Sequence, residues 1–257
     1  MSNVHVTGAA RGIGRAIALR LASDGHHVAM SDLPTMRAEL EDTRAAVEGC
    51  GVRTAAIDAD VADPASVRAL VQQTVAALGS LDVMVANAGI SQTSALLDLP
   101  VEEFDRVHAV NARGTFLCYT EAARQMISQG NGGKVIGAGS IAAYRGYPYS
   151  AAYCVSKFGV RALTQVAAQE WAPHGITVNA YCPGVVDTHM WVEIDSALSA
   201  LTGAPAHESM RAMVDDIALG RAANCDDVAK LVSFLVGPDS DYLTGQSILV
   251  DGGMVFI

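Results

Sequence analysis

The sequence predicts an α/β fold in which helices cover both faces of a parallel β-sheet of about seven strands. Short apolar runs alternate with longer amphipathic segments along the whole chain. Such alternation is typical of right-handed βαβ units. No charge block, low-complexity tract or linker rich in proline and glycine divides the 257 residues. We therefore expect one domain over residues 1–257.

The expected strands are short runs rich in β-branched and apolar residues. They are Val4–Thr7, His27–Ser31, Arg53–Ile57, Val83–Ala86, Lys134–Ala138, Thr177–Tyr181 and Ser247–Val250. The segments between them carry apolar residues at helical spacing. The expected helices are Ile13–Ser23, Met36–Gly49, Pro64–Leu78, Val101–Ser128, Ala152–Ala172 and Cys225–Val236. Parallel strands joined by such helices make a doubly wound sheet.

One segment, from Pro183 to Leu219, breaks this alternation. It is irregular, contains Gly203 and Pro205, and shows only short helical pieces. It lies near the carboxyl ends of the last strands, where open α/β sheets bind ligands. Residues 183–219 are therefore expected to form a small helical lid over a substrate. The alternative is a packed subdomain that does not gate the site.

Composition argues against several classes of function. The formal net charge of −10 and the absence of a Lys/Arg cluster argue against nucleic acid and anionic membranes. No stretch approaches the ~20 apolar residues of a membrane span. The five cysteines are scattered without a C-x-x-C pair, and the seven histidines lack metal-ligand spacing. We expect a cytoplasmic protein with free thiols and with no metal, membrane or nucleic-acid partner.

A glycine-rich turn joins the first expected strand to the first expected helix. Glycines at such a turn let the backbone approach a pyrophosphate, and the helix N-terminus supplies free N–H groups and partial positive charge. In this strand–turn–helix context the pattern indicates a Rossmann-like dinucleotide site. The expected cofactor contacts in the turn are Gly8, Arg11, Gly12, Ile13 and Gly14.

Two charged residues bear on the choice of cofactor. Asp32 ends the second expected strand, where a carboxylate can accept both adenosine ribose hydroxyls and would repel a 2′-phosphate. It can also be read as a turn residue ahead of Pro34. Arg11, beside the glycine turn, is a conflicting signal because a cation there could pair with that phosphate. The position of Asp32 favours NAD over NADP.

Two further strand ends are candidates for cofactor contacts. Asp60 and Val61 follow the third expected strand and could hold the adenine edge, although Asp60 could also belong to the N-cap region before Pro64. The segment Asn87–Gly89 closes the fourth expected strand, where small residues would let a cofactor lie against the backbone. An ordinary Asn/Gly turn would have the same composition.

Tyr153 and Lys157 are four residues apart, so they share one face of an expected helix. Alone, such a pair is more often a packing contact than a catalytic one. Ser140 precedes the pair by thirteen residues, and Asn111 lies in the long helix expected upstream. With the glycine turn and Asn87–Gly89, these residues in this order resemble the short-chain dehydrogenase/reductases over essentially the whole chain.

The resemblance implies a role for each of these residues. Tyr153 would act as general acid or base, and Lys157 would stabilise its phenolate and bind the nicotinamide ribose. Ser140 would hold the substrate oxygen, and Asn111 would hold a water that extends the proton path. The cofactor contacts implied near the end of the sixth strand are Pro183, Gly184, Val186 and Thr188.

Four segments resemble the acetoin/diacetyl reductase, or 2,3-butanediol dehydrogenase, branch of that family. They are Asp32–Pro34, Gly175–Gly184, Met190–Asp195 and Asp251–Met254. The branch interconverts vicinal diketones, hydroxyketones and diols with NAD(H), and its members imply a homotetramer. The implied substrate pocket contains Ser140, Ile141, Ala142, Tyr147, Tyr153, Gly184, Val185 and Trp191.

The expected pocket is mostly apolar and has no assigned basic residue, which favours a neutral ketone or alcohol over a charged 2-oxo acid. Ile141 and Tyr147 depart from the pattern of some meso-diol enzymes. They leave room for a bulkier aryl hydroxyketone, an amino alcohol or a polyol. A non-catalytic NAD-binding sensor and a sugar-nucleotide epimerase are the rival classes, which the complete catalytic set and the short C-terminal region respectively disfavour.

Overall fold

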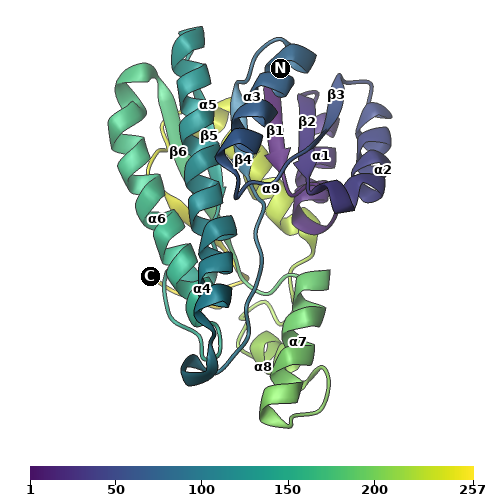
Figure 1. Cartoon of the computed structure of the whole chain (residues 1–257), viewed down its shortest axis with the longest axis vertical. Helices are drawn as coiled ribbons and strands as arrows, with labels where there is room; N and C mark the ends of the chain where they lie inside the picture. Colours follow the sequence, from purple (N-terminus) through teal and green to yellow (C-terminus); the bar gives the residue numbers. More distant parts are fainter.

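One parallel sheet with helices on both faces forms the body of the protein (Figure 1), in a computed structural model that describes all residues 1–257. The strand order is β3-β2-β1-β4-β5-β6-β7, and every pairing is parallel. The strands are β1 Asn3–Thr7, β2 His27–Asp32, β3 Thr54–Asp58, β4 Val83–Ala86, β5 Gly133–Ala138, β6 Ile176–Pro183 and β7 Ser247–Val250. The predicted seven-stranded doubly wound fold is confirmed.

Nine α-helices connect and extend these strands. They are α1 Gly12–Ser23, α2 Arg37–Glu48, α3 Pro64–Leu78, α4 Val101–His108, α5 Thr115–Gln129, α6 Ala151–Trp171, α7 His189–Thr202, α8 Glu208–Asp215 and α9 Cys225–Val236. The helices α1, α2 and α9 pack on one face of the sheet, and α3, α5 and α6 pack on the other. Each face therefore has its own apolar core.

The alternation of side chains along β1 divides these two cores. Val4 and Val6 face α1 and α9, whereas His5 between them faces α3. His5 is fully buried, and its Nδ1 lies 2.7 Å from the hydroxyl of Thr74 and its Nε2 lies 2.9 Å from the hydroxyl of Ser31. Thr74 donates its own proton to the carbonyl of Leu70, so it accepts from Nδ1–H and the neutral ring is satisfied on both sides.

The connections from β1 and from β4 leave the sheet on opposite faces. The chain after β1 enters α1, whereas the chain after β4 continues toward α4 and α5. Adjacent parallel strands with this divergence form a topological switch point, and a crevice opens at their carboxyl ends. The glycine turn and the segment Asn87–Gly89 both lie at this crevice.

The prediction of one continuous helix over Val101–Ser128 is wrong in the middle of that range. The structure has α4, then a π-helical segment at Ala109–Gly114, then α5. Asn111 lies in the widened turn, where its side chain bonds both backbone groups of Ile90 and its own carbonyl accepts from Thr115 Oγ1 at 2.7 Å. A tertiary contact thus inserts into the helix, which is a common cause of π-bulges at functional sites.

The irregular segment of the sequence folds into two helices, α7 and α8, which extend beyond the carboxyl edge of the sheet (Figure 1). Gly203 ends α7 in the left-handed conformation, with φ of 74°. Asp195 of α7 is buried and accepts the backbone N–H groups of His207 and Met210 at 2.6 and 3.2 Å. This carboxylate therefore caps the start of α8 and fastens the two helices together.

Other features of the fold bear on the expectations from composition. All five cysteines are unpaired. No cluster of three or more His, Cys, Asp or Glu side chains is arranged to hold a metal ion. None of the helices combines the length and apolarity that crossing a membrane requires.

Acid sensitivity of the fold follows from His5. Burial lowers the pKa of this ring from 6.5 to about 3. Below pH 6.5 the unfolded chain therefore binds a proton that the folded chain refuses until about pH 3. Above pH 6.5 the His5 ring has no effect on the free energy of unfolding. Between pH 6.5 and about pH 3 that free energy falls as the pH falls, by about 3 kcal/mol at about pH 4.5.

His5→Gln should remove this part of the acid sensitivity, because the amide stays neutral and keeps a donor and an acceptor. Urea unfolding at about pH 7 and pH 4.5 measures it, at one protein concentration. We expect the wild type to lose about 3 kcal/mol more than the variant between these conditions. Equal losses in the two proteins would contradict the assignment.

Candidate active site

A cleft of about 1120 Å³ opens at the carboxyl edge of the sheet, between the strand ends and α7 and α8. Almost every residue expected in the site lines it. On the nucleotide side these are Gly8, Arg11, Gly12, Ile13, Gly14, Asp32, Asp60, Val61, Asn87, Ala88 and Gly89. On the reaction side they are Ser140, Ile141, Ala142, Tyr147, Tyr153, Lys157, Pro183, Gly184, Val186, Thr188 and Trp191. Asn111 and Val185 are buried behind the wall of the cleft.

The glycine turn forms a cradle that only glycine can build at these positions. Gly8 and Gly12 have φ of 65° and 59°, in the left-handed region. A Cβ on Gly14 would lie 2.1 Å from the carbonyl oxygen of Gly8, so α1 can approach the turn only without a side chain there. The N-terminus of α1 consequently points its free N–H groups into the cleft, and the residues present fit a dinucleotide pyrophosphate.

Asn87 fixes this cradle to the rest of the sheet. Its Nδ2 donates to the carbonyls of Thr7 and Gly8 at 2.9 and 3.0 Å, and its Oδ1 accepts from the Tyr181 hydroxyl at 2.7 Å. The Thr7 hydroxyl in turn accepts the N–H groups of Asn87 and Ala88, each at 3.0 Å. The amide of Asn87 is thus engaged in holding the turn. The sequence did not identify Thr7 or Tyr181, whose partners are distant in the chain.

Asp32 stands at the end of β2 with its carboxylate held by backbone. Oδ2 accepts from the N–H of Ala10 at 3.0 Å, and Oδ1 accepts from the N–H of Leu33 at 2.9 Å. Each oxygen keeps a free lone pair that faces hydroxyl groups entering the cleft. Arg11 immediately precedes α1 and lines the same side of the cleft.

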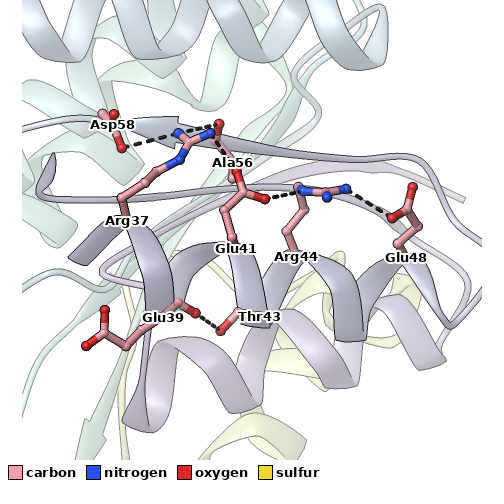
Figure 2. A network of polar contacts seen from close by, with 8 residues as sticks. All are labelled: Arg37, Glu39, Glu41, Thr43, Arg44, Glu48, Ala56 and Asp58. Carbon is pink, nitrogen blue, oxygen red and sulfur yellow. Dashed lines mark hydrogen bonds and ion pairs between the residues drawn. The ribbon is translucent and has the colours of Figure 1, made fainter. Parts of the chain in front are cut away.

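Basic residues on α2, the next helix after Asp32, are neutralised by acidic partners (Figure 2). Arg37 pairs with Glu41 at 2.5 Å and with Asp58 at 3.3 Å. Glu41 also pairs with Arg44 at 2.6 Å, and Arg44 pairs with Glu48 at 3.0 Å. The network pairs two guanidinium groups with three carboxylates, so Arg37 is already matched with negative charge.

The reaction side of the cleft is built on β5 and α6. Lys157 is buried, donates from Nζ to the carbonyl of Ala138 at 2.8 Å, and lies 5.4 Å from the ring centroid of Tyr153. Ser140 follows β5, and its Oγ accepts the N–H of Ala142 at 3.1 Å. This contact fixes the hydroxyl oxygen and leaves its proton free to donate to a ligand. The structure therefore brings Ser140, Tyr153 and Lys157 into one cleft.

Burial governs the protonation of the tyrosine and the lysine. It raises the pKa of Tyr153 to about 12, against a smaller lowering by the Ser140 hydroxyl. Burial also lowers the pKa of Lys157 to about 8. Burial is thus the dominant effect on the pKa of Tyr153, and stabilisation of the phenolate by Lys157 stays a prediction. At neutral pH the phenol keeps its proton.

Asn111 and Ser156 connect the π-helical segment to α6. Asn111 accepts the N–H of Ile90 at 2.9 Å, and its Nδ2 donates to the carbonyl of Ile90 at 2.9 Å and to the Ser156 hydroxyl at 3.1 Å. Ser156 donates to the carbonyl of Tyr153 at 2.7 Å. The sequence did not identify Ser156 because its partner is 45 residues away.

An apolar cluster forms the substrate end of the cleft. Ile141, Val185, Ile217 and Met254 are its buried centre, and Tyr147 and Trp191 pack against it. Val185, expected to contact the substrate, instead supports this wall from behind.

A cation does lie near the substrate end, contrary to expectation. Arg145 donates from Nε to the Tyr147 hydroxyl oxygen at 2.8 Å, and its guanidinium lies 4.8 Å from the ring centroid. Nothing in the sequence indicates that the loop turns Arg145 back over Tyr147. Because this contact occupies only the oxygen, the Tyr147 proton remains available to a ligand.

Comparisons with known proteins agree with this geometry. A family model described as enoyl-(acyl carrier protein) reductase matches residues 8–255. A short-chain dehydrogenase/reductase of Armillaria gallica is 49% identical over 98% of this chain and 95% of its own length. L-2,3-Butanediol dehydrogenase of Corynebacterium glutamicum is 44% identical over 98% and 97%. Solved NAD⁺-bound xylitol dehydrogenase is 32% identical, with a TM-score of 0.93 over 97% of each chain.

The glycine cradle and the Ser/Tyr/Lys group in one cleft define a nucleotide-dependent oxidoreductase. The chain belongs to the short-chain dehydrogenase/reductase family, as the sequence predicted. It is an alcohol dehydrogenase or ketone reductase, which interconverts a secondary alcohol and a ketone.

Proposed function

We propose that this protein uses NAD(H) to interconvert vicinal diketones, hydroxyketones and diols, such as diacetyl, acetoin and 2,3-butanediol. The observation that carries the proposal is the convergence of Ser140, Tyr153 and Lys157 in a cleft that begins at the glycine cradle. The similarity to a 2,3-butanediol dehydrogenase over nearly the whole chain supports this substrate class.

In the reduction, Tyr153 donates its proton to the substrate carbonyl oxygen as that oxygen gains charge. Ser140 donates a hydrogen bond to the same oxygen and holds the carbonyl in place. Lys157 would hold the nicotinamide ribose of a bound cofactor, and its positive charge favours the phenolate that Tyr153 leaves behind. The cofactor would supply the hydride. In alcohol oxidation the proton moves in the opposite direction.

Asn111 supports this proton transfer in two ways. Its side chain holds Ile90 and Ser156, and through Ser156 it reaches the first turn of α6. Its main-chain carbonyl already accepts from Thr115 but retains a second lone pair. We assign to that lone pair the water expected to extend the proton path from Tyr153 and Lys157.

The preference for NAD(H) rests on charge around the end of β2. Asp32 is held with free lone pairs toward the cleft, where ribose hydroxyls can donate to it. A 2′-phosphate would meet the same carboxylate and would be repelled. Arg37 cannot compensate without losing its pairs with Glu41 and Asp58 (Figure 2).

The substrate end favours a small ketone with a neighbouring oxygen. The apolar side chains of the wall offer a charged substrate group no hydrogen-bond or ionic partner. Such a group would lose its hydration on entering the cleft without compensation. Burial raises the pKa of Tyr147, so the phenol is protonated and can donate to a second oxygen. Trp191, in the first turn of α7, carries a ring N–H that can do the same.

A second candidate is a bulkier hydroxyketone, amino alcohol or polyol. The observation that favours it is an apolar row on α7, formed by Met190, Ile194 and Leu198, which lines the same cleft. These residues are spaced by four, so they share one face of the helix. Together with Met213 of α8, they extend the apolar wall beyond what a four-carbon substrate can cover.

Self-association as a homotetramer completes the proposal, and light scattering tests it. Val155, Phe158 and Val166 form an apolar stripe on the outer face of α6 and are 52%, 43% and 51% exposed. Phe116 of the neighbouring helix α5 is 46% exposed. Exposed apolar stripes of this kind favour contact with a second copy.

The unpaired cysteines fit a reducing, cytoplasmic setting.

Tyr153→Phe should reduce turnover by about 10²–10⁴-fold because the ring still packs but the transferable proton is gone. NADH binding, measured by fluorescence titration, should be nearly unchanged. Lys157→Ala should impair both turnover and NADH binding. A Tyr153→Phe enzyme with more than about a tenth of the wild-type rate would exclude the general-acid role.

The wild type should prefer NADH to NADPH by a factor on the order of 100 in kcat/KM, because the 2′-phosphate meets Asp32. Asp32→Ala should remove most of this preference. Steady-state rates with both cofactors measure it, and Glu39→Ala, an acidic residue of α2 outside the ion pairs, is the matched control. A wild-type preference for NADPH would contradict the proposal and would indicate that Arg11, by pairing with the 2′-phosphate, determines the choice of cofactor.

Trp191→Ala should raise KM for diacetyl and acetoin and improve the relative rate on bulky aryl ketones. The ring is both a hydrogen-bond donor and part of the wall. Val192→Ala, on the exposed side of the same helix, is the control. A coupled NADH assay over diacetyl, both acetoin enantiomers, aryl diketones and pyruvate checks it. Pyruvate outperforming diacetyl, or an unchanged profile in Trp191→Ala, would refute this pocket.

A further inference from the structure

Gln92 is a buried amide that links two loops at the mouth of the cleft. It follows β4, is 5% exposed and lines the cleft. Its Oε1 accepts the N–H of Ala152 at 3.1 Å, and its Nε2 donates to the carbonyl of Tyr149 at 3.3 Å. Both partners lie about 60 residues away along the chain, immediately before Tyr153.

The helix α6 needs this contact because its own N-terminus is poorly capped. Ser150 stands at the N-cap but makes no side-chain hydrogen bond to the helix. The first N–H groups of a helix have no partner within the helix and must find one elsewhere. Gln92 supplies that partner to Ala152, which is joined by one peptide bond to Tyr153.

The loop that leads into α6 is strained at Tyr149. This residue has φ of 64°, which non-glycine residues rarely adopt. Its carbonyl accepts from Gln92 and also from the N–H of Ser94 at 2.9 Å. The chain after β4 therefore holds the strained loop through two donors to one carbonyl oxygen and fixes the direction from which α6 begins.

Residues 90–92 are also connected to α6 by a second chain of hydrogen bonds. Ile90 bonds Asn111 through both of its backbone groups, Asn111 donates to Ser156, and Ser156 donates to the carbonyl of Tyr153. Residues 90–92 are thus connected to the first turn of α6 by two independent routes. A shift of this segment would move Tyr153 relative to Ser140, which follows β5.

We propose that Gln92 is a positioning residue for Tyr153. Its amide is engaged with the backbone of Ala152 and Tyr149 and makes no hydrogen bond to Ser140, Tyr153 or Lys157. By capping α6 and holding Tyr149, it keeps the Tyr153 hydroxyl in register with the Ser140 hydroxyl and the substrate carbonyl. This inference rests on the proposed function, in which Tyr153 transfers the proton.

The test compares Gln92→Met with Gln92→Glu in diacetyl reduction. Methionine matches the volume but makes no hydrogen bond, and kcat should fall about 10–100-fold because a small misplacement of Tyr153 is costly. KM for NADH should stay within about twofold, since the glycine cradle is untouched. Glutamate keeps an acceptor for the Ala152 N–H but its carboxylate cannot donate to the Tyr149 carbonyl, so kcat should rise about fivefold above that of Gln92→Met without reaching wild type.

A pH profile separates positioning from general loosening. In Gln92→Met the phenol moves away from Ser140, so the alkaline limb of kcat should shift to higher pH. Gln125→Met removes a comparable amide on α5, bonded to Gln129 at 2.9 Å, and should leave kcat and its pH profile unchanged. If Gln92→Met does not fold, Gln92→Asn, whose amide is too short to reach, should show the same loss.

Three results would overturn the inference. They are wild-type kcat in Gln92→Met, an equal loss of kcat and NADH affinity, or a kcat in Gln92→Glu as low as in Gln92→Met. Failure of the proposed function is recognised separately, because the wild type would then not reduce diacetyl or Tyr153→Phe would retain activity.

Discussion

The side-chain amide of Asn87 holds the point on which the rest of the site depends. It joins the end of β1, the first glycine of the turn and the Tyr181 hydroxyl on β6. The carboxyl ends of three strands are thereby fixed by one planar group whose donor and acceptor are both used. Because Gly14 leaves no room for a Cβ against this junction, α1 is pressed onto it with its N–H groups facing the cleft.

The same burial that stabilises the reaction side also sets its chemistry. Desolvation favours the neutral form of both ionisable groups, so it raises the pKa of Tyr153 to about 12 and lowers that of Lys157 to about 8. A protonated phenol is the form that ketone reduction requires. Alcohol oxidation requires the phenolate. The positive charge of Lys157 and that of an oxidised nicotinamide would stabilise it, and each unit by which they lower the pKa of Tyr153 corresponds to about 1.4 kcal/mol.

The sequence was informative where structure is decided locally. Strands β1 to β7 and the glycine turn follow from apolar periodicity and from glycine's freedom at φ near 60°, both of which are visible in short windows. The π-helical segment at Asn111 could not be found in this way, since it is produced by a contact with Ile90, 21 residues away. Gln92 and Ser156 were missed for the same reason: nothing in a polar residue's neighbours reveals a partner elsewhere in the fold.

This difference also explains why the cofactor end is easier to infer than the substrate end. The cradle binds through backbone N–H groups, whose direction is fixed by the turn itself. The substrate wall is assembled from the loop after β5, from α7, from the segment after α8 and from the chain near the C-terminus. The orientation of α7 and α8 to each other depends on the buried carboxylate of Asp195. Val185, which follows β6, adds a fifth segment to the substrate wall. Substrate choice is therefore a property of how five distant segments pack, whereas the reaction type is set by a few residues after β5 and on α6.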